Sequence, residues 1–407
     1  MAGIGQQVTG EGPVGVAGPS VVRPWGQGRA RAAAAVYGQA VVQALPAWVA
    51  SRLLVVAGLV LSHLIVSTVR PDNAGAQLRV HQGLLAWDGG WYQSIAGHGY
   101  AASGLQSVRF FPGYPMAARV LGWIPGVGVG TALVVISNAC ALAAMAALVV
   151  LVRHDLGDGA LARRSVWLLA LAPSAYSLVL GYADSALLLC SIVTVLAART
   201  QRWWWAAAAG GVAGLVRPVG LLLVVPVLIE VWRDRRLRAP GRPPTSPLAE
   251  AAAAAAPVAG TAVYLGWVWA QFGDPWLPFR VQQQHGHRGA VTLPLAAMWR
   301  NLESVVHGHH VGSSLHILWV LLCMALLVVA YRRLPLSYAG FATAVLVVSV
   351  ASSNLDSFER YALGAFPLVI AASTLTSRRG VEWVVLTVAG AAMVGYAVLA
   401  FLGVTVP

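Results

Sequence analysis

The sequence predicts an all-α protein that spans a membrane about eleven times. Of its 407 residues, 58% are hydrophobic and 10% are charged, and the mean hydropathy is +0.70, well above that of an ordinary soluble domain. Long apolar runs alternate along the chain with short arginine-rich segments. Because a membrane helix needs about 20 apolar residues and arginines in short loops mark the cytoplasmic side, these two patterns predict both the spans and their orientation.

The apolar runs define eleven predicted spans, some of them short or broken. They cover residues 46–69, 128–152, 165–181, 184–199, 204–216, 218–232, 251–271, 313–331, 338–352, 361–376 and 381–403. Residues 1–45 lack the apolar core and cleavage site of a secretory signal, and we expect them to form a flexible cytoplasmic tail. Residues 46–407 are predicted to form a single transmembrane domain.

The distribution of arginine gives the orientation. With the tail inside, the cytoplasmic segments hold 17 of the 27 basic residues, and every basic residue of the chain is an arginine. The eight arginines on the opposite side are spread over much longer segments. Two of these segments, 70–127 and 272–312, become large extracytoplasmic loops, and the first has amphipathic stretches suited to the membrane interface. Chemistry on an outer-face substrate of the plasma membrane would have to occur in these loops.

The stretch 203–232 begins and ends beside arginine clusters, so both of its ends are expected in the cytoplasm. We predict two short helices broken at Arg217-Pro218, because proline lacks the N–H and disfavours helical geometry in the preceding residue. An arginine inside an apolar region is costly and is a candidate for function. Arg52 also lies in an apolar span, but we expect its side chain to extend to the cytoplasmic face.

The first outer loop contains a carboxylate, Asp88, in "AWDGGWYQSIAGHGY" (86–100). The flanking sequence is amphipathic, which places this acid at the membrane surface beside Trp87, Trp91 and Tyr92. On residue types alone, the simpler interpretation is a solvated acid in an aromatic interfacial belt. The alternative is a general base, because partial desolvation raises the pKa of a carboxyl and its affinity for a hydroxyl proton.

Two further outer charges also have two interpretations. Asp184 precedes an apolar helical run, where an N-cap is the default role, and from a cavity wall it could instead bind sugar hydroxyls. Asp356, Glu359 and Arg360 lie at the start of another outer helix, where the acids suit the helix dipole and the arginine does not. An arginine placed against the dipole favours a role in holding an anion such as a phosphate.

Several functions are disfavoured because their motifs are missing. The sequence has no Walker A segment, no GxGxxG in a strand-helix context and no GxSxG elbow, and no cofactor is expected. No aromatic-interleaved basic stripe predicts a nucleic-acid partner, and the three cysteines are interpreted as buried hydrophobes. No metal is expected, because the outer histidines lack a carboxylate at diagnostic spacing. These histidines are His285, His287, His307, His309 and His310.

Six segments together resemble the PIG-V-type mannosyltransferases, a branch of the GT-C glycosyltransferase superfamily. "LLAWDGGWYQSIAGHGY" and "VRFFPGYPMAARVLG" are similar to the family's first outer loop, with its WD, WY, IA and GY pairs and its FFPLYP-like stretch. "APSAYSLVLGYADSALLL", "LVRPVGLLL", "FGDPWLPFRVQQQH" and "SFERYALGAFPLVIAAS" follow in the family's order. The similarity extends from about residue 46 to residue 376.

The resemblance implies a GT-C-like fold whose outer-face cavity binds a lipid-phosphate sugar, usually polyprenyl- or dolichyl-phosphate mannose. It implies an inverting transfer of mannose, or another hexose, to a hydroxyl of a glycolipid, a lipoglycan or a protein. The acid of the family's first outer loop matches Asp88, which would be the general base. Arg217 and Arg360 fall in matching segments, and we infer from their charge and placement that they contact the donor phosphate.

Substrate contacts are expected from residues in the same segments: Trp87, Trp91, Tyr92, Asp184 and Tyr361. The chain departs from the family at Asp184, where Glu is more usual, at Ala183, where Ser is usual, and at Gly113, where Leu is usual. The first of these changes shortens a contact to a hydroxyl, so the identity of the acceptor stays open.

Besides the glycosyltransferase, two functions without catalysis remain possible interpretations of the sequence. A multi-spanning transporter or flippase for lipids or sugars would also show intramembrane charges and a broken helix pair. The acid-bearing loop 70–127 has no counterpart in the second half of the chain, however, whereas transporters of this kind often consist of two related halves. A scaffold subunit is also compatible with the composition.

Overall fold

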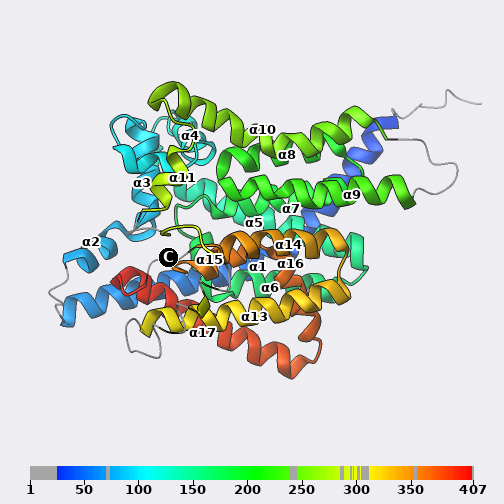
Figure 1. The fold of residues 1–407 in the computed structure, drawn as a ribbon. Helices are drawn as coiled ribbons and strands as arrows, with labels where there is room; N and C mark the ends of the chain where they lie inside the picture. Colours follow the sequence, from blue (N-terminus) through cyan, green and yellow to red (C-terminus); the bar gives the residue numbers. More distant parts are fainter. Residues whose placement is uncertain are drawn as a thin grey trace, which may run out of the picture.

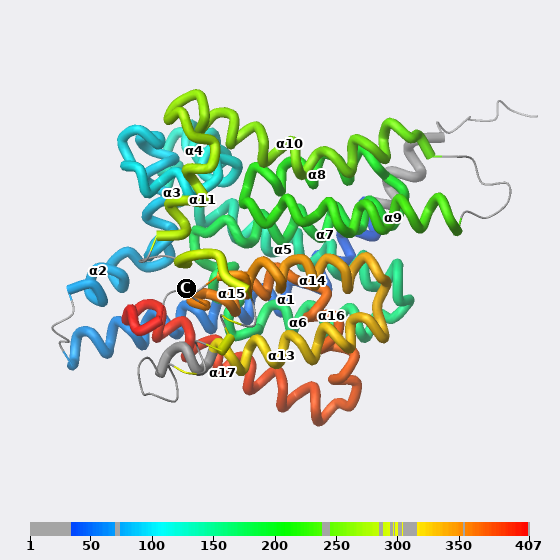
Figure 2. The backbone as a smooth tube through the Cα atoms, in the orientation of Figure 1, coloured from blue at the N-terminus to red at the C-terminus, as the bar shows by residue number. Residues whose placement is uncertain are grey.

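Helices make up most of the part of the chain that the computed structural model describes, residues 25–69, 74–237, 245–284, 288–293, 296, 298–299, 303, 311–352 and 355–405 (Figures 1 and 2). A single isolated antiparallel bridge, Val291 to Ser352, joins two loops there. The α-helices are α1 (Trp25–Val69), α2 (Ala74–Gln82), α3 (Asp88–His98), α4 (Gly113–Leu121), α5 (Val129–Leu156), α6 (Gly159–Leu171), α7 (Asp184–Arg199), α8 (Trp203–Val216), α9 (Val224–Leu237), α10 (Pro247–Phe272), α11 (Leu277–Gln282), α13 (Val311–Arg333), α14 (Leu336–Val350), α15 (Phe358–Leu363), α16 (Phe366–Leu375) and α17 (Arg379–Leu402). Short 3-10 helices are η1 (Gly83–Leu85), η2 (Leu105–Arg109), η3 (Pro173–Leu178) and η4 (Pro218–Leu223).

In the part of the chain that the structure describes, five helices are long and apolar enough to cross a membrane. They are Ala34–Val69 within α1, α5, α10, His316–Arg333 within α13, and α17. Shorter apolar helices, α8, α14 and α16, accompany them. This confirms an all-α protein with membrane-spanning helices, while the total of eleven spans stays a prediction.

The long helices form a bundle with two distinct ends. The short helices α2, α3, α4 and α11 gather at one end, on the left in Figure 1, which we call the α3 end. The last turns of α9 and the first turns of α6 and α17 lie at the opposite end. One continuous hydrophobic core extends from α1 to α17, in which α5 packs against α1, α6 and α7, and α17 packs against α1 and η3.

Helix α1 begins earlier than the sequence predicts. Residues 25–45, expected as part of a flexible tail, are helical, and Pro46 lies inside the helix without ending it. The run is rich in alanine, the best helix former, and Ala40, Ala44 and Ala47 are fully buried on one face. Because this face packs against the rest of the protein, the folded domain starts before residue 46; residues 1–24 lie outside the described part.

Two of the predicted spans are interrupted. In 165–181, helix α6 ends at Leu171 and Pro173 begins η3. In 361–376, α15 ends at Leu363 and α16 begins at Phe366. Hydropathy measures how apolar a run is and not whether its backbone continues as a helix, so proline and glycine breaks inside apolar runs escape it.

The predicted break at Arg217-Pro218 is confirmed. Helix α8 ends at Val216, Arg217 is extended with φ −156° and ψ 151°, and Pro218 begins η4, which leads into α9. Arg217 lies in this extended connection, and its side chain donates to Asp184.

Small residues bring α8 and α10 into backbone contact, which allows a stability test. A Cβ added at Gly260 would overlap the carbonyl of Gly211, whereas a Cβ added at Gly266 of the same helix would meet nothing within 4 Å. We expect Gly260→Ala to lower the free energy of unfolding by about 1–3 kcal/mol through overpacking. Gly266→Ala, the matched control, should leave the free energy of unfolding unchanged or raise it by about 0.5–1 kcal/mol. Thermal unfolding of the purified variants measures both, and equal stabilities would contradict this packing.

Candidate functional site

Four charged residues from distant parts of the sequence meet next to α3. Arg360 donates from Nη2 to Asp88 Oδ2 at 2.6 Å and from Nε to Asp184 Oδ2 at 3.0 Å. Arg217 pairs with the other oxygen of Asp184. Asp88 and Arg360 are 272 residues apart in the sequence, so only the fold brings them together. The result is a partly buried chain of alternating charges, Asp88–Arg360–Asp184–Arg217.

Asp88 is the first residue of α3 and follows a strained turn. Trp87 has φ 59° and ψ −119°, a backbone conformation that residues other than glycine rarely adopt. Its indole Nε1 donates to the Ala400 carbonyl at 2.8 Å, and the Arg79 guanidinium lies 4.6 Å from its ring centroid. The side chain of Trp87 therefore anchors the turn to the end of α17, so its part in this structure is to position Asp88.

Tyr182, which the sequence analysis did not single out, also positions the site. Its side chain is fully buried, its hydroxyl donates to the Ala86 carbonyl at 3.2 Å, and the Arg360 guanidinium lies 4.7 Å from its ring centroid. A single ring thus contacts both the turn before Asp88 and the arginine that holds Asp88. The sequence feature that could have identified Tyr182 is its place in "GYADS", two residues before Asp184.

Contrary to the prediction, the Arg52 side chain does not extend to the cytoplasmic face. Its Nε donates to Asn138 Oδ1 at 2.8 Å and its Nη2 donates to the Leu178 carbonyl at 3.0 Å. Asn138 in turn donates to the Val179 carbonyl at 2.9 Å. These carbonyls become available where η3 ends, and backbone groups in an apolar region require partners. Arg52 therefore stabilises the segment that leads to Asp184.

Asp184 is not an N-cap. Helix α7 begins at Asp184 itself, and its preceding residue, Ala183, makes no side-chain cap. Both carboxylate oxygens of Asp184 are engaged by arginines, and its side chain is 10% exposed. The Asp184 carboxylate therefore orients Arg217 and Arg360, and its contact with sugar hydroxyls stays a prediction.

Asp88 differs from Asp184 in having an oxygen outside the ion pairs. Arg360 holds Oδ2, while among the described residues no hydrogen bond reaches Oδ1, and the side chain is 26% exposed. Burial raises the pKa of the Asp88 carboxyl, but the guanidiniums of Arg360, Arg217 and Arg109 together lower it below its ordinary value. The predicted rise in pKa is therefore wrong, and Asp88 is ionised at neutral pH.

Two more arginines surround this cluster. Arg109 lies close enough to lower the Asp88 pKa, and Arg288 lies 4.3 Å from the ring centroid of Tyr361. Arg217 approaches the same ring at 5.1 Å. Among the described residues of this cluster, four arginines thus gather near Asp88 and Asp184, so arginines outnumber carboxylates there. Such an excess favours an anionic ligand.

The aromatic residues predicted to contact substrate take different places. Tyr92 is 2% exposed and packs edge-on against Phe110 and Tyr114, each at a centroid distance of 5.0 Å, so it supports α3 from the core. Trp91 stacks on Phe110 and is half-buried. Tyr361 is half-buried between Arg217 and Arg288, where it can face a ligand.

Comparison of the chain with models of known protein families and with curated proteins gives no match. The resemblance to the PIG-V-type family therefore stands on the sequence segments alone. The geometry of Asp88, Asp184, Arg217 and Arg360 provides an independent basis for a functional hypothesis.

Within the described ranges, no group of three His, Cys, Asp or Glu side chains is arranged to hold a metal ion. The outer histidines His285, His287, His307, His309 and His310 lie outside those ranges. The expectation that the protein needs no metal stays a prediction.

Proposed function

We propose that this protein is an inverting membrane glycosyltransferase. It moves mannose, or another hexose, from a polyprenyl-phosphate sugar to an acceptor hydroxyl at the extracytoplasmic face of the plasma membrane. The acceptor is a glycolipid, a lipoglycan or a protein. The observation that carries the proposal is the asymmetry of the two acids: Asp184 uses both oxygens in ion pairs, whereas Asp88 keeps one oxygen for a substrate.

The chemistry needs few groups because phosphate is a good leaving group. Asp88 Oδ1 accepts the proton of the acceptor hydroxyl while that oxygen attacks C1 of the sugar. The bond between C1 and the phosphate oxygen breaks, and polyprenyl phosphate leaves with the electron pair. Asp88 then releases its proton to water. A single displacement inverts the configuration at C1, and no covalent sugar-enzyme bond forms.

Positive charge around the site stabilises the departing phosphate in this proposal. Arg217 and Arg360 contribute charge from within their ion pairs, where their side chains are only 11% and 4% exposed. The half-buried Arg109 and Arg288 add to it from the surrounding surface. A bound phosphate would also weaken the electrostatic attraction between the arginines and the Asp88 carboxylate. The pKa of Asp88 would then rise, and Asp88 would be a better base when the donor is present.

A flippase or transporter is the alternative, because buried charge networks and helices broken within the membrane also occur in transporters. Lipid and glycan profiling of a deletion strain separates the two. Loss of one defined sugar from a surface glycolipid or glycan, with its unglycosylated precursor accumulating, supports transfer. Loss of the complete molecule from the outer leaflet, with the finished product accumulating inside, would support transport instead.

The ion pair of Asp88 predicts an unusual pH dependence. Because the Asp88 pKa is lowered, the base stays ionised as the pH falls, and kcat/KM should be constant down to about pH 5, with loss beginning near the ordinary carboxyl pKa of about 4 or below. Arg360→Gln removes the strongest lowering influence, so its acid limb should move up by about one to three pH units. Arg280→Gln, an exposed arginine paired with Asp274, is the control and should leave the profile unchanged. A wild-type acid limb between pH 6 and 7 would contradict the assignment of Asp88.

A further inference from the structure

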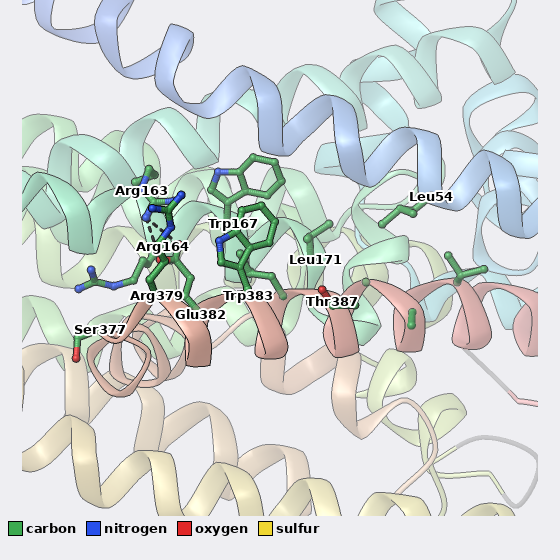
Figure 3. Close-up of a pocket in the computed structure, with 14 residues that line it drawn as sticks. Leu54, Arg163, Arg164, Trp167, Leu171, Ser377, Arg379, Glu382, Trp383 and Thr387 are labelled. Carbon is green, nitrogen blue, oxygen red and sulfur yellow. Dashed lines mark hydrogen bonds and ion pairs between the residues drawn. The ribbon is translucent and has the colours of Figure 1, made fainter.

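A cavity lies far from Asp88, between α1, α6 and α17. It has a volume of about 730 Å³ and is lined at one end by Arg163, Arg164, Arg379 and Glu382, and along the rest by apolar side chains (Figure 3). The charged side chains gather at the first turn of α17 and the early part of α6. The cavity is therefore a groove with a charged end, which we call the basic end, and an apolar remainder, which we call the apolar track.

The basic end carries a net positive charge. Three arginines lie near two acids: Glu382, which pairs with Arg163 at 2.8 Å, and Asp158, whose Oδ2 lies 3.8 Å from Arg164. The Arg163 side chain is still 46% exposed, and Arg379 is exposed at the N-terminus of α17. The helix dipole adds partial positive charge at that N-terminus. An anionic group, and a phosphate in particular, complements this end of the groove.

The apolar track follows α17 away from the arginines. Trp167 and Trp383 stand next to the charged end, and Leu171, Leu386 and Val394 continue the wall. Trp383 is 63% exposed, as is typical of a tryptophan at the level of lipid headgroups. A headgroup level followed by an apolar wall matches the anatomy of a membrane lipid.

The basic end of the groove and the Asp88 site lie at opposite ends of α17. Helix α17 has 24 residues and is therefore about 36 Å long, enough to cross the hydrocarbon core of about 30 Å. Arg379 is its first residue, while Ala400, near its last, accepts the hydrogen bond from Trp87 beside Asp88. The groove is therefore separate from any donor site next to Asp88.

We infer that this groove binds an anionic phospholipid of the membrane leaflet that faces the arginine-rich segments of the protein. The phosphodiester lies between Arg163, Arg164 and Arg379, and the acyl chains lie along α17. Basic pockets between transmembrane helices on the cytoplasmic side are suited to anionic headgroups. The inference does not depend on the proposed transferase activity, since its readout is lipid binding.

Native mass spectrometry of the purified protein with phosphatidylglycerol or phosphatidylcholine tests this. We expect wild-type protein to retain phosphatidylglycerol in preference to phosphatidylcholine, and Arg379→Gln to weaken that binding about tenfold, as for loss of a charged hydrogen bond. Arg378→Gln is the matched control: Arg378 is the exposed neighbour of Arg379 and does not line the groove, so binding should change by no more than about twofold.

A second variant tests the apolar track without changing charge. Ala391 is exposed and lines the groove, so Ala391→Trp should fill the track and displace the lipid while the protein stays folded. Equal losses for Arg378→Gln and Arg379→Gln, undiminished binding by Ala391→Trp, or equal retention of the two lipids by wild-type protein would each overturn the inference.

Discussion

Replacing Asp88 with asparagine is expected to lower the rate of sugar transfer by about 10²- to 10⁴-fold, the usual contribution of a general base. Asparagine keeps the shape of the side chain, and its amide oxygen can still accept the hydrogen bond from Arg360. Arg360 also keeps its second partner, Asp184, so the variant should fold. Binding of the polyprenyl-phosphate donor should therefore be retained while the proton acceptor is lost.

Asp274→Asn is the matched control for this variant. Asp274 lies at the same end of the bundle, is similarly exposed at 21%, and pairs with Arg280 at 2.5 Å, but it is not part of the Asp88 cluster. Transfer by Asp274→Asn should stay within about twofold of wild type, as for an exposed ion pair. Near-normal transfer by Asp88→Asn, or equal losses in both variants, would remove Asp88 from the role of base.

Replacing Arg360 with glutamine should have the second largest effect, and it should act on stability as well as on transfer. Arg360 is 4% exposed and holds both carboxylates, so its loss leaves Asp88 without its partner and Asp184 with only Arg217. Breaking a buried ion pair from one side costs about 3–5 kcal/mol, because a charge is left uncompensated. Thermal unfolding in detergent measures this loss.

A double variant distinguishes an uncompensated charge from a simple loss of packing. Arg360→Gln with Asp88→Asn removes the acid that Arg360→Gln leaves without its partner, while Asp184 keeps Arg217, so the double variant should recover part of the stability that Arg360→Gln loses. The exposed Arg280→Gln should change stability by less than about 1 kcal/mol. If the destabilisation of the double variant equals the sum of those of the two single variants, Arg360 and Asp88 are not energetically coupled, contrary to their contact.

Much of the fold follows from patterns that act locally along the chain. Apolar length identifies the regions of α5, α10 and α17, and the arginine clusters with Pro218 identify the break after α8. The breaks at η3 and between α15 and α16 were missed because they lie within apolar runs. The early start of α1 was missed because it depends on a buried alanine face, which is a property of tertiary packing.

The candidate site could be predicted in part. Asp88, Arg217 and Arg360 stand out in the sequence because charge is costly in apolar surroundings, and the structure brings all three together with Asp184. Their pairing could not be predicted, since partners up to 272 residues apart leave no local pattern. For the same reason, the pKa of Asp88 was expected to rise from burial, whereas its unforeseen arginine neighbours lower it.

The most direct test of the central proposal is a transfer assay with purified protein in liposomes. The protein is supplied with polyprenyl-phosphate radiolabelled mannose and with a lipid and glycan extract from a deletion strain as acceptor. The proposal predicts that wild-type protein moves label from the donor lipid into the product missing from that strain, and that Asp88→Asn does not. Label that crosses the bilayer on an intact donor without being transferred would contradict it and would favour a transporter.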